Sequence, residues 1–432
     1  MAVQGDGSTT PKVSRVTPVY APPPPGGVVV YRGALSIVGK AGEIYATHGG
    51  ITLSVVDREP QLQWFDEGQG LSASLHIERI DIPSGGSLAP QELLFLRRKP
   101  PSSPSFRSLS GETFAGDLGA AERFIIHITG TRLKAQLPTV ETQDGIQGQV
   151  TFALPGWTLR LVADAEAYAF VIEATPDSLP ITIKEVERLE WQLFLLLSLL
   201  RGREAGLAAT AGIHDLGHVV WARWAKPRRG TGQWQWCPDH LFADAFTELA
   251  QAFSKLADNP TMEKVVDRAI NLYLTANGTQ PIDARIPVAC SGLELLAWAV
   301  LQTEQWLTTG AFSKLWAAAN LRLLLQWSGI PIDAPSAFTE LEARRLSLEQ
   351  PDLAGPDAVL KIRNDLVHPP KRLSKLEWPS VAEMQQAWRL SMHYLELVIL
   401  RILGYQGQYL PRLQLTARWA TDTESVPWAR QR

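Results

Sequence analysis

The sequence predicts an α+β protein in which a β-rich N-terminal domain, a sandwich or an open barrel, precedes an all-α helical bundle. Three observations lead to this prediction. Residues 28–180 contain short β-type runs separated by Gly and Pro. From residue 181 onward, helix start signals and amphipathic stretches replace that pattern. The chain of 432 residues is also long enough for two or three domains with their own cores.

The N-terminal part divides into a tail and a β domain. Residues 1–27 are rich in Pro, Gly, Ser and Thr, which predicts a disordered or polyproline-like tail. The β-type runs at 28–180 recur with turn signals between them, as in a sandwich or barrel. The clearest of these runs are residues 50–56, 71–77, 123–129 and 157–162.

A connecting region, residues 181–258, follows the β domain. Thr182 and Glu185 match a capping box, which predicts a helix that continues to about residue 200. A Trp-rich segment at 202–238 is predicted to be a hairpin or loop insert before helix returns.

The remaining region, residues 259–432, carries the signals of several helices joined by short connections, as in a bundle. Asn259 followed by Pro260 predicts a helix start. Ser291 and Glu294 match a second capping box. Further starts are expected at Pro356 and at the capping box of Ser380 and Glu383, whose helix should end at Gly404.

Composition excludes several classes of protein. The net charge is −3 and the pI is about 6.3, so no global basic field marks a nucleic-acid binder. Two cysteines indicate no disulfide framework and fit a reducing compartment. The first residues lack the apolar core of a signal peptide, and the most apolar run, 194–200, is too short to span a bilayer. We therefore expect a cytoplasmic protein without membrane association.

The stretch from Lys361 to Pro370 concentrates polar chemistry at a helix end. Asn364 and His368 lie four positions apart and so share one face of a helix. Pro369 disfavours helical geometry at His368, so the imidazole should lie at or just past the C-terminus. Together with Arg363, these residues supply a fixed cation, an amide and a titratable ring, which suit a phosphodiester substrate.

Arg363-Asn364-Asp365-Leu366-Val367-His368 resembles the R-x(4–6)-H signature of HEPN domains, with the polar residue that often follows the arginine. The context is also similar: a short helix, the motif, a proline stop and then a long amphipathic helix. The resemblance covers about the last 170 residues, the size of one domain. It implies a small antiparallel helical bundle of the kind found in prokaryotic antiviral and toxin systems.

The resemblance implies a metal-independent endoribonuclease without a cofactor, in antiviral defence or a toxin-like role. Arg363, Asn364 and His368 would be the catalytic residues, RNA the substrate, and a homodimer through the C-terminal helical domain the active form. The β-rich domain would sense an unidentified trigger or place the RNA. Basic residues around the motif are candidates for RNA binding: Lys361, Lys371, Arg372 and Lys375.

Glu294 has two interpretations. HEPN domains often place an acidic residue from an earlier helix beside the arginine, so the resemblance makes Glu294 a possible orienting acid. Its position as the fourth residue of the pattern that starts at Ser291 is a sufficient local explanation, and we favour the cap.

Two rival interpretations come from other classes. In the first, the bundle is a non-catalytic dimerisation or ligand-binding scaffold with a degenerate HEPN-like site, and the motif only ends a helix. In the second, a zinc site forms from residues whose types and spacings zinc accepts. Those residues are His214, His218, Cys237 and His240. A turn at residues 215–217 would separate the first two, and we place this zinc site last.

Overall fold

The computed structural model describes the backbone of strands β1 to β9 between residues 28 and 116 and most of the chain thereafter. After β9, the described ranges are 117–129, 137–142, 145–164, 169–214, 219–224, 232, 234–347, 354–368, 377–413 and 422–429. The predicted tail at 1–27 lies outside the described residues.

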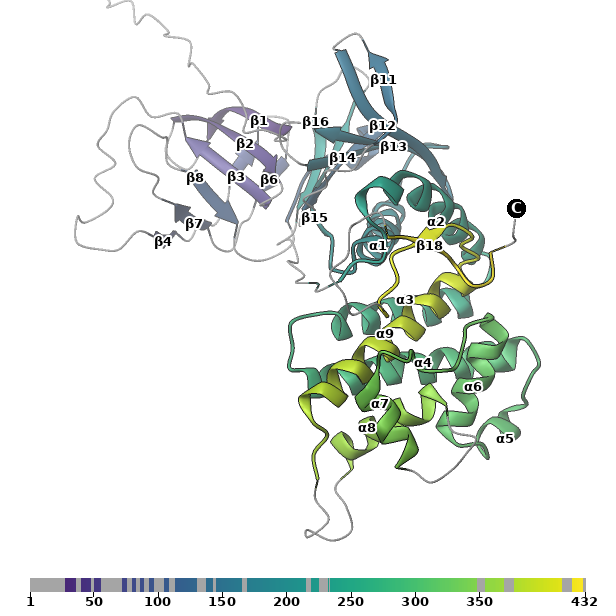
Figure 1. Ribbon diagram of the computed structural model, residues 1–432. Coiled ribbons are helices and arrows are strands. Elements are labelled where there is room, and N and C mark those ends of the chain that lie inside the picture. Colours follow the sequence, from purple (N-terminus) through teal and green to yellow (C-terminus); the bar gives the residue numbers. More distant parts are fainter. Residues whose placement is uncertain are drawn as a thin grey trace, which may run out of the picture.

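Two antiparallel sheets form the first part of the molecule (Figure 1). The six-stranded sheet has the order β1-β2-β3-β8-β7-β4, and β5 and β6 pair as a separate hairpin. The bounds are β1 Val28–Leu35, β2 Lys40–Thr47, β3 Gly50–Val55, β4 Ser72–Leu75, β5 Ile80–Ile82, β6 Gly86–Leu88, β7 Leu93–Leu96 and β8 Ser105–Ser108.

The second sheet has eight strands in the order β11-β12-β13-β14-β10-β15-β16-β9. Its strands are β9 Thr113–Gly116, β10 Arg123–Thr129, β11 Thr139–Thr142, β12 Gly145–Leu154, β13 Trp157–Asp164, β14 Ala169–Pro176, β15 Gly206–Ile213 and β16 Val219–Trp224. The short helix η1, Leu118–Ala120, precedes β10. The sheets touch through β2 and β3 on one side and β10 and β15 on the other.

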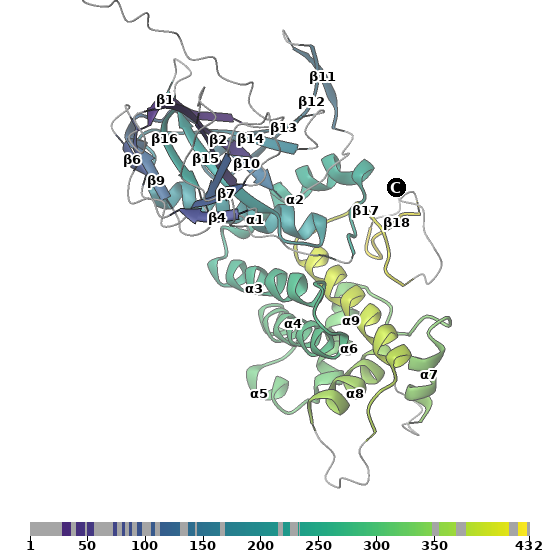
Figure 2. The same ribbon diagram turned by 90° about the vertical axis from the view of Figure 1, so that its left-hand side faces the viewer.

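Helices α1, Ile183–Arg201, and α2, Phe242–Leu256, lie between the eight-stranded sheet and the remaining helices (Figure 2). Phe124 of β10 is fully buried, as is Phe246 of α2. Phe246 packs edge-on against Phe152 of β12 with ring centroids 4.4 Å apart. The helices therefore share one apolar core with the sheet.

The C-terminal helices form an antiparallel bundle around α4. The helices are α3 Pro260–Ala276, α4 Ile282–Thr303, α5 Thr309–Phe312, α6 Ala317–Ser328, α7 Thr339–Leu346, α8 Gly355–Val367 and α9 Val381–Ile402. Helix α4 contacts α3, α6, α8 and α9. Gly292 allows the close approach of α9, because a Cβ there would lie 3.0 Å from Leu395 Cδ1.

Helix α4 is also the one described helix that is long and apolar enough to cross a membrane. Of its apolar window, 61% is buried inside the structure. Its apolar character is thus accounted for by its central place among the other helices.

A segment after α9 joins the bundle to the region before α2. It contains the short strands β17, Gln408–Tyr409, and β18, Glu424–Ser425. Arg412 is buried and donates through Nη2 to Glu396 Oε2 of α9, at 2.9 Å, and to Asn277 Oδ1 at the end of α3, at 3.1 Å. Asn277 in turn donates to the carbonyl of Trp234, so one buried network connects these parts.

The α+β fold class is confirmed. The capping boxes at Thr182 and Ser380 begin α1 and α9, and Asn259 caps α3, as predicted. The Trp-rich segment contains a hairpin, as predicted, because β15 pairs with β16. The hairpin is not a separate insert, since both strands belong to the eight-stranded sheet, between β10 and β9. The sheet therefore extends past the expected boundary at residue 180.

Candidate functional site

The motif helix α8 ends at the histidine, as the sequence predicts. Its first turn is held by the backbone N–H of Ala354, which donates to Asp357 Oδ2 at 2.9 Å. His368 is the C-cap residue in an extended conformation, φ −115° and ψ 112°. Its N–H donates to the carbonyl of Asn364 at 2.8 Å, and its side chain is exposed. The imidazole is therefore presented to solvent at a helix end.

Arg363 is held by two neighbours. Its Nη2 donates to Glu294 Oε1 of α4 at 3.1 Å, and its Nη1 donates to Asn364 Oδ1 at 2.9 Å. The arginine side chain is 22% exposed and the glutamate 36% exposed, so both can still meet a ligand. A guanidinium fixed at two nitrogens presents its remaining donors in a defined direction.

The predicted capping box at Ser291 and Glu294 is wrong. Helix α4 begins at Ile282, so both residues lie in its interior. Ser291 Oγ donates to the carbonyl of Pro287, one turn earlier, at 2.9 Å. The pattern matched by coincidence of spacing, and the Glu294 carboxylate bonds to Arg363 instead.

Cys290 lies one turn before Glu294 and is fully buried. Burial raises the pKa of its thiol to about 12, the negative charge of Glu294 adds to that effect, and Arg363 opposes it. The thiol is therefore protonated near neutral pH and is no nucleophile. The predicted catalytic residues therefore remain Arg363, Asn364 and His368.

The three predicted catalytic residues share one helix end but do not all touch. Asn364 contacts Arg363, whereas the ring of His368 bonds to no described residue. Of the basic residues expected to bind RNA, Lys361 bonds to Asp365 one turn along α8. The others, Lys371, Arg372 and Lys375, lie outside the described residues.

Arg344 of α7 is a neighbour of the motif that no sequence pattern singled out. Its Nη2 bonds to Asp365, and its Nη1 lies 3.7 Å from Glu383 Oε1 of α9. No local pattern connects these three helices, because they meet only through the tertiary fold.

The residues of the alternative zinc site are placed in different surroundings. Cys237 is fully buried, its thiol pKa is raised by burial, and its Sγ lies 3.7 Å from the carbonyl of Pro238. His240 is exposed in the short helix η2, Asp239–Leu241, and His214 Nε2 lies 3.9 Å from Glu122 Oε1. His218 lies outside the described residues. Among the residues that the structure describes, no group of three or more His, Cys, Asp or Glu could hold a metal ion.

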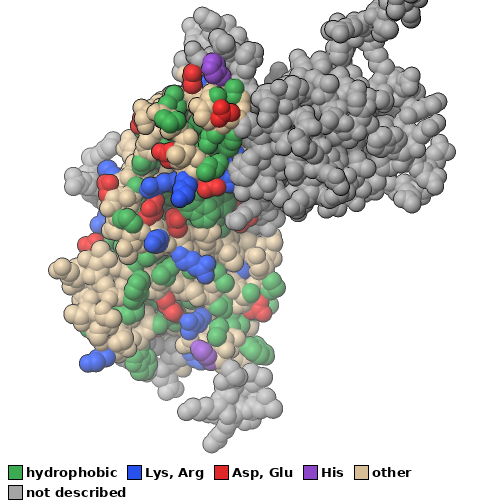
Figure 3. Space-filling model, turned by 180° about the vertical axis from the view of Figure 1, so that it is seen from behind, with side chains coloured by type: hydrophobic (Ala, Val, Ile, Leu, Met, Phe, Trp, Pro, Cys, Tyr) green, Lys and Arg blue, Asp and Glu red, His purple; other side chains and the backbone are tan. Residues whose placement is uncertain are grey.

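The described surface carries charges of both signs. On the face seen in Figure 3, basic side chains are interspersed with acidic and hydrophobic ones rather than gathered into one field. Near the motif, Val367 is 45% exposed on α8, and Trp298, one turn after Glu294 on α4, is 46% exposed. These apolar side chains could support contact with another molecule.

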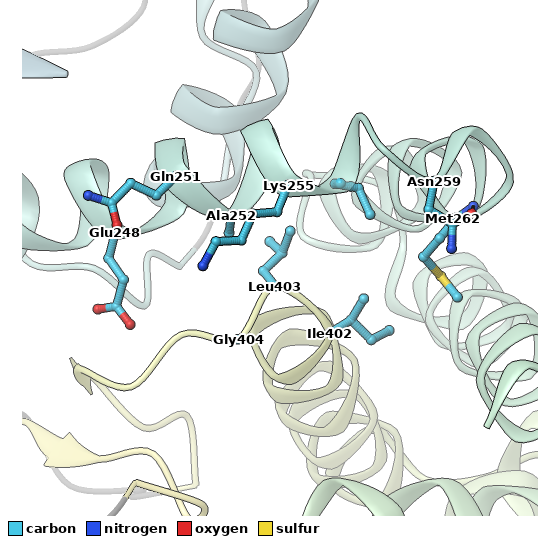
Figure 4. A pocket seen from close by; sticks show the side chains of 10 residues that line it. Glu248, Gln251, Ala252, Lys255, Asn259, Met262, Ile402, Leu403 and Gly404 are labelled. Carbon is cyan, nitrogen blue, oxygen red and sulfur yellow. Dashed lines mark hydrogen bonds between the residues drawn. The ribbon is translucent and has the colours of Figure 1, made fainter. Parts of the chain in front are cut away.

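A separate cleft of about 460 Å³ lies at the opposite end of α9 (Figure 4). Its lining comes from α2, the start of α3 and the end of α9: Glu248, Gln251, Ala252, Lys255, Leu256, Asn259, Met262, Ile402, Leu403 and Gly404. Because α9 rises about 1.5 Å per residue, the cleft lies roughly 30 Å from the end of α9 that faces the motif. It shares no residue with the candidate site.

Residues 259–425 match the family described as the YopA C-terminal domain. The chain is also similar to the SPbeta prophage-derived uncharacterized protein YopA of Bacillus subtilis (strain 168), with 26% identity over 249 residues. That match covers 57% of this chain and 54% of the relative, so the chain spans about half the length of that protein. No solved structure matches the chain.

Proposed function

We propose that this chain is a metal-independent endoribonuclease whose site is the end of α8. The observation that carries the proposal is the contact of Arg363 with Glu294, 3.1 Å, which brings an acid from an earlier helix to the arginine of the R-x4-H motif. The HEPN resemblance implies such an arrangement. The family match at residues 259–425 leaves the activity open, since the relative is uncharacterized.

The reaction would be transesterification within RNA. A base removes the proton of a ribose 2′-OH, the 2′-oxygen forms a bond to phosphorus, and the bond from phosphorus to the 5′-oxygen breaks. An acid gives a proton to the leaving 5′-oxygen, which leaves a 2′,3′-cyclic phosphate. His368 would serve as base or acid, and Arg363 would stabilise the added charge on the phosphorane. Asn364, which bonds to Arg363, would help to aim the guanidinium.

A homodimer would supply both proton-transfer groups. Each chain offers one His368, whereas the reaction needs a base and an acid. A two-fold contact that pairs the ends of α8 would place two histidines in one cleft. The exposed Trp298 and Val367 beside the ion pair would give such a contact apolar anchors.

A non-catalytic scaffold is the second candidate, and a specific observation favours it. Glu294 neutralises Arg363, and an arginine bound to a carboxylate has less charge to offer a phosphate. In a scaffold, this pair would only join α4 to α8.

The biological role that we propose for the endoribonuclease is antiviral defence or a toxin-like role. This role follows from the HEPN resemblance, and it suits a relative that is prophage-derived.

The deciding experiment is cleavage of labelled RNA by the purified full chain in the presence of EDTA. We expect cleavage that persists in chelator, a 2′,3′-cyclic phosphate product and no cleavage of 2′-O-methyl RNA or of DNA. His368→Ala should abolish cleavage, and Arg363→Lys should impair it strongly because a point charge cannot replace the planar fork.

The matched control is His240→Ala, which removes an exposed histidine away from the motif. A folded His368→Ala protein that cuts at the wild-type rate would exclude the assigned site. Absence of cleavage by the wild type under all conditions would favour the scaffold.

A further inference from the structure

Arg344 bridges the two helices that flank the candidate histidine. Its guanidinium bonds to Asp365 in the last turn of α8 and reaches Glu383 Oε1 in the first turn of α9 at 3.7 Å. The three side chains are 21%, 17% and 16% exposed. Shielding from solvent makes such pairs stronger than those on an open surface.

Both carboxylates are themselves anchored. Lys361 bonds to the other oxygen of Asp365. Glu383 Oε2 accepts the N–H of Ser380, at 2.6 Å, as part of the capping box of α9. Helix α7 is fixed as well, because the N–H of Leu341 donates to Gln386 Oε1 of α9 at 2.8 Å. Arg344 therefore connects groups that already have defined positions.

His368, by contrast, has no side-chain anchor among the described residues. Its N–H bonds to the carbonyl of Asn364, and Asp365 lies in the same final turn. The position of the imidazole relative to Arg363 thus depends on where that turn is held. Asp365 is the member of the turn that bonds to another helix.

We propose that Arg344 is a positioning residue for His368, acting through Asp365 and Glu383; this inference rests on the proposed function. Arg344 does not contact the reacting atoms. Its loss removes the described polar link from the last turn of α8 to α7 and α9, and the imidazole then samples several positions. Misplacement of a reacting group by about 1 Å costs on the order of 100-fold in rate.

The test compares Arg344→Gln with Arg345→Gln in the full chain. Arg345 is the matched control, because it is the next arginine of α7 and forms a bidentate ion pair with Glu342 of the same helix. We expect kcat for RNA cleavage to fall roughly 10- to 100-fold in Arg344→Gln with KM nearly unchanged. The control should keep its rate within about twofold. Arg344→Lys should recover part of the loss, since an ammonium can bond to one carboxylate but cannot span both.

A second measurement does not depend on activity. In protein with ¹³C-labelled histidine rings, Arg344→Gln should shift or broaden the ring signal of His368 and leave that of His240 unchanged. Asp365→Asn and Glu383→Gln, each of which removes one arm of the bridge, should do the same if Arg344→Gln fails to fold. An unchanged His368 signal in the folded variants overturns the positioning role. A shifted signal in a protein that never cuts RNA keeps the positioning role and removes the proposed function.

Discussion

At the scale of single residues, the candidate site depends on one contact that crosses from α4 to α8. Arg363 follows from a local motif, and its partner Glu294 lies 69 positions earlier. The sequence identified Glu294 as a candidate but favoured the wrong role, because S-x-x-E is a local pattern and the true partner is tertiary. Helix α4 begins at Ile282, before the S-x-x-E pattern, so no helix start remains there to be capped.

Variants of Glu294 distinguish its effect on the orientation of Arg363 from its effect on the stability of the fold. Glu294→Ala should lower RNA cleavage by about tenfold or more, because Arg363 loses a bond that aims it. Glu294→Gln should lower it less, since the amide oxygen can still accept from the guanidinium. The carboxylate is 36% exposed, so the free energy of unfolding should change by less than about 1 kcal/mol.

Cleavage rates and urea unfolding of the same two variants check this expectation. A cleavage rate that rises in Glu294→Ala would mean that Glu294 suppresses Arg363 instead of orienting it.

His393 of α9 gives the stability of the fold a defined pH dependence. Burial lowers the pKa of its imidazole to about 3, with a further contribution from the positive charge of Arg412. The folded protein therefore holds a neutral ring, while the unfolded chain binds a proton below about pH 6.5. Stability from this group is fully present above pH 6.5 and is lost as the pH falls toward 3, by on the order of 4 kcal/mol.

Urea midpoints between pH 7 and pH 4 for the wild type and His393→Phe measure that contribution. The stability of His393→Phe should fall much less between pH 7 and pH 4 than that of the wild type. The phenylalanine keeps an aromatic ring beside Tyr394 and Tyr409. Equal declines in both proteins would assign the acid sensitivity to other groups.

At the scale of elements, local patterns in the sequence correctly predicted where several helices begin and end. Thr182, Asn259 and Ser380 begin their helices because a side-chain oxygen satisfies N–H groups that the helix leaves free. Gly404 ends α9 with φ of 71°, a conformation that favours glycine. The place of β15 and β16 could not be predicted in the same way, because β15 pairs with β10 about 80 residues earlier.

The two S-x-x-E patterns offer a direct comparison of a real cap with an apparent one. Ser380→Ala removes the acceptor of the Glu383 N–H at the start of α9 and should cost about 1 kcal/mol of unfolding free energy. Ser291→Ala, in the interior of α4, should change it by less than about 0.5 kcal/mol, because alanine favours helix and the serine bonds only to Pro287. Urea unfolding of both variants tests the pair, and equal losses would contradict the helix boundaries.

At the scale of the whole molecule, a buried ion pair joins the segment after α9 to the bundle. Arg412 and Glu396 are 2% and 0% exposed, and Tyr273 donates to the same carboxylate oxygen at 2.9 Å. Arg412 also lies over the rings of Trp234 and Trp388, 5.7 Å from each centroid. No periodicity or motif in the sequence could have predicted this pairing, which depends on side chains from distant parts of the chain.

Arg412→Ala should lower the free energy of unfolding by about 3 to 5 kcal/mol, because it leaves the Glu396 carboxylate buried without its cation. Arg345→Ala, which removes the ion pair with Glu342 on the surface of α7, should change the free energy of unfolding much less. Paired replacement of Arg412 and Glu396 by apolar residues of similar volume should recover part of the loss. Chemical unfolding of the wild type, the two single variants and the paired replacement tests this expectation. A small loss of unfolding free energy in Arg412→Ala would show that water reaches the carboxylate of Glu396.

The buried ion pair of Arg412 and Glu396 can form only after residue 412 has been synthesised. Tyr273 precedes Arg412 by 139 residues, so a ribosome that adds about 5 to 20 residues per second needs roughly 7 to 28 seconds between them. Glu294 and Arg363 emerge during that interval, before the cation that Glu396 requires. A nascent chain would therefore hold both members of the candidate site in a bundle that is not yet stable. If the motif is active as proposed, its activity would be delayed until residue 412 has left the exit tunnel.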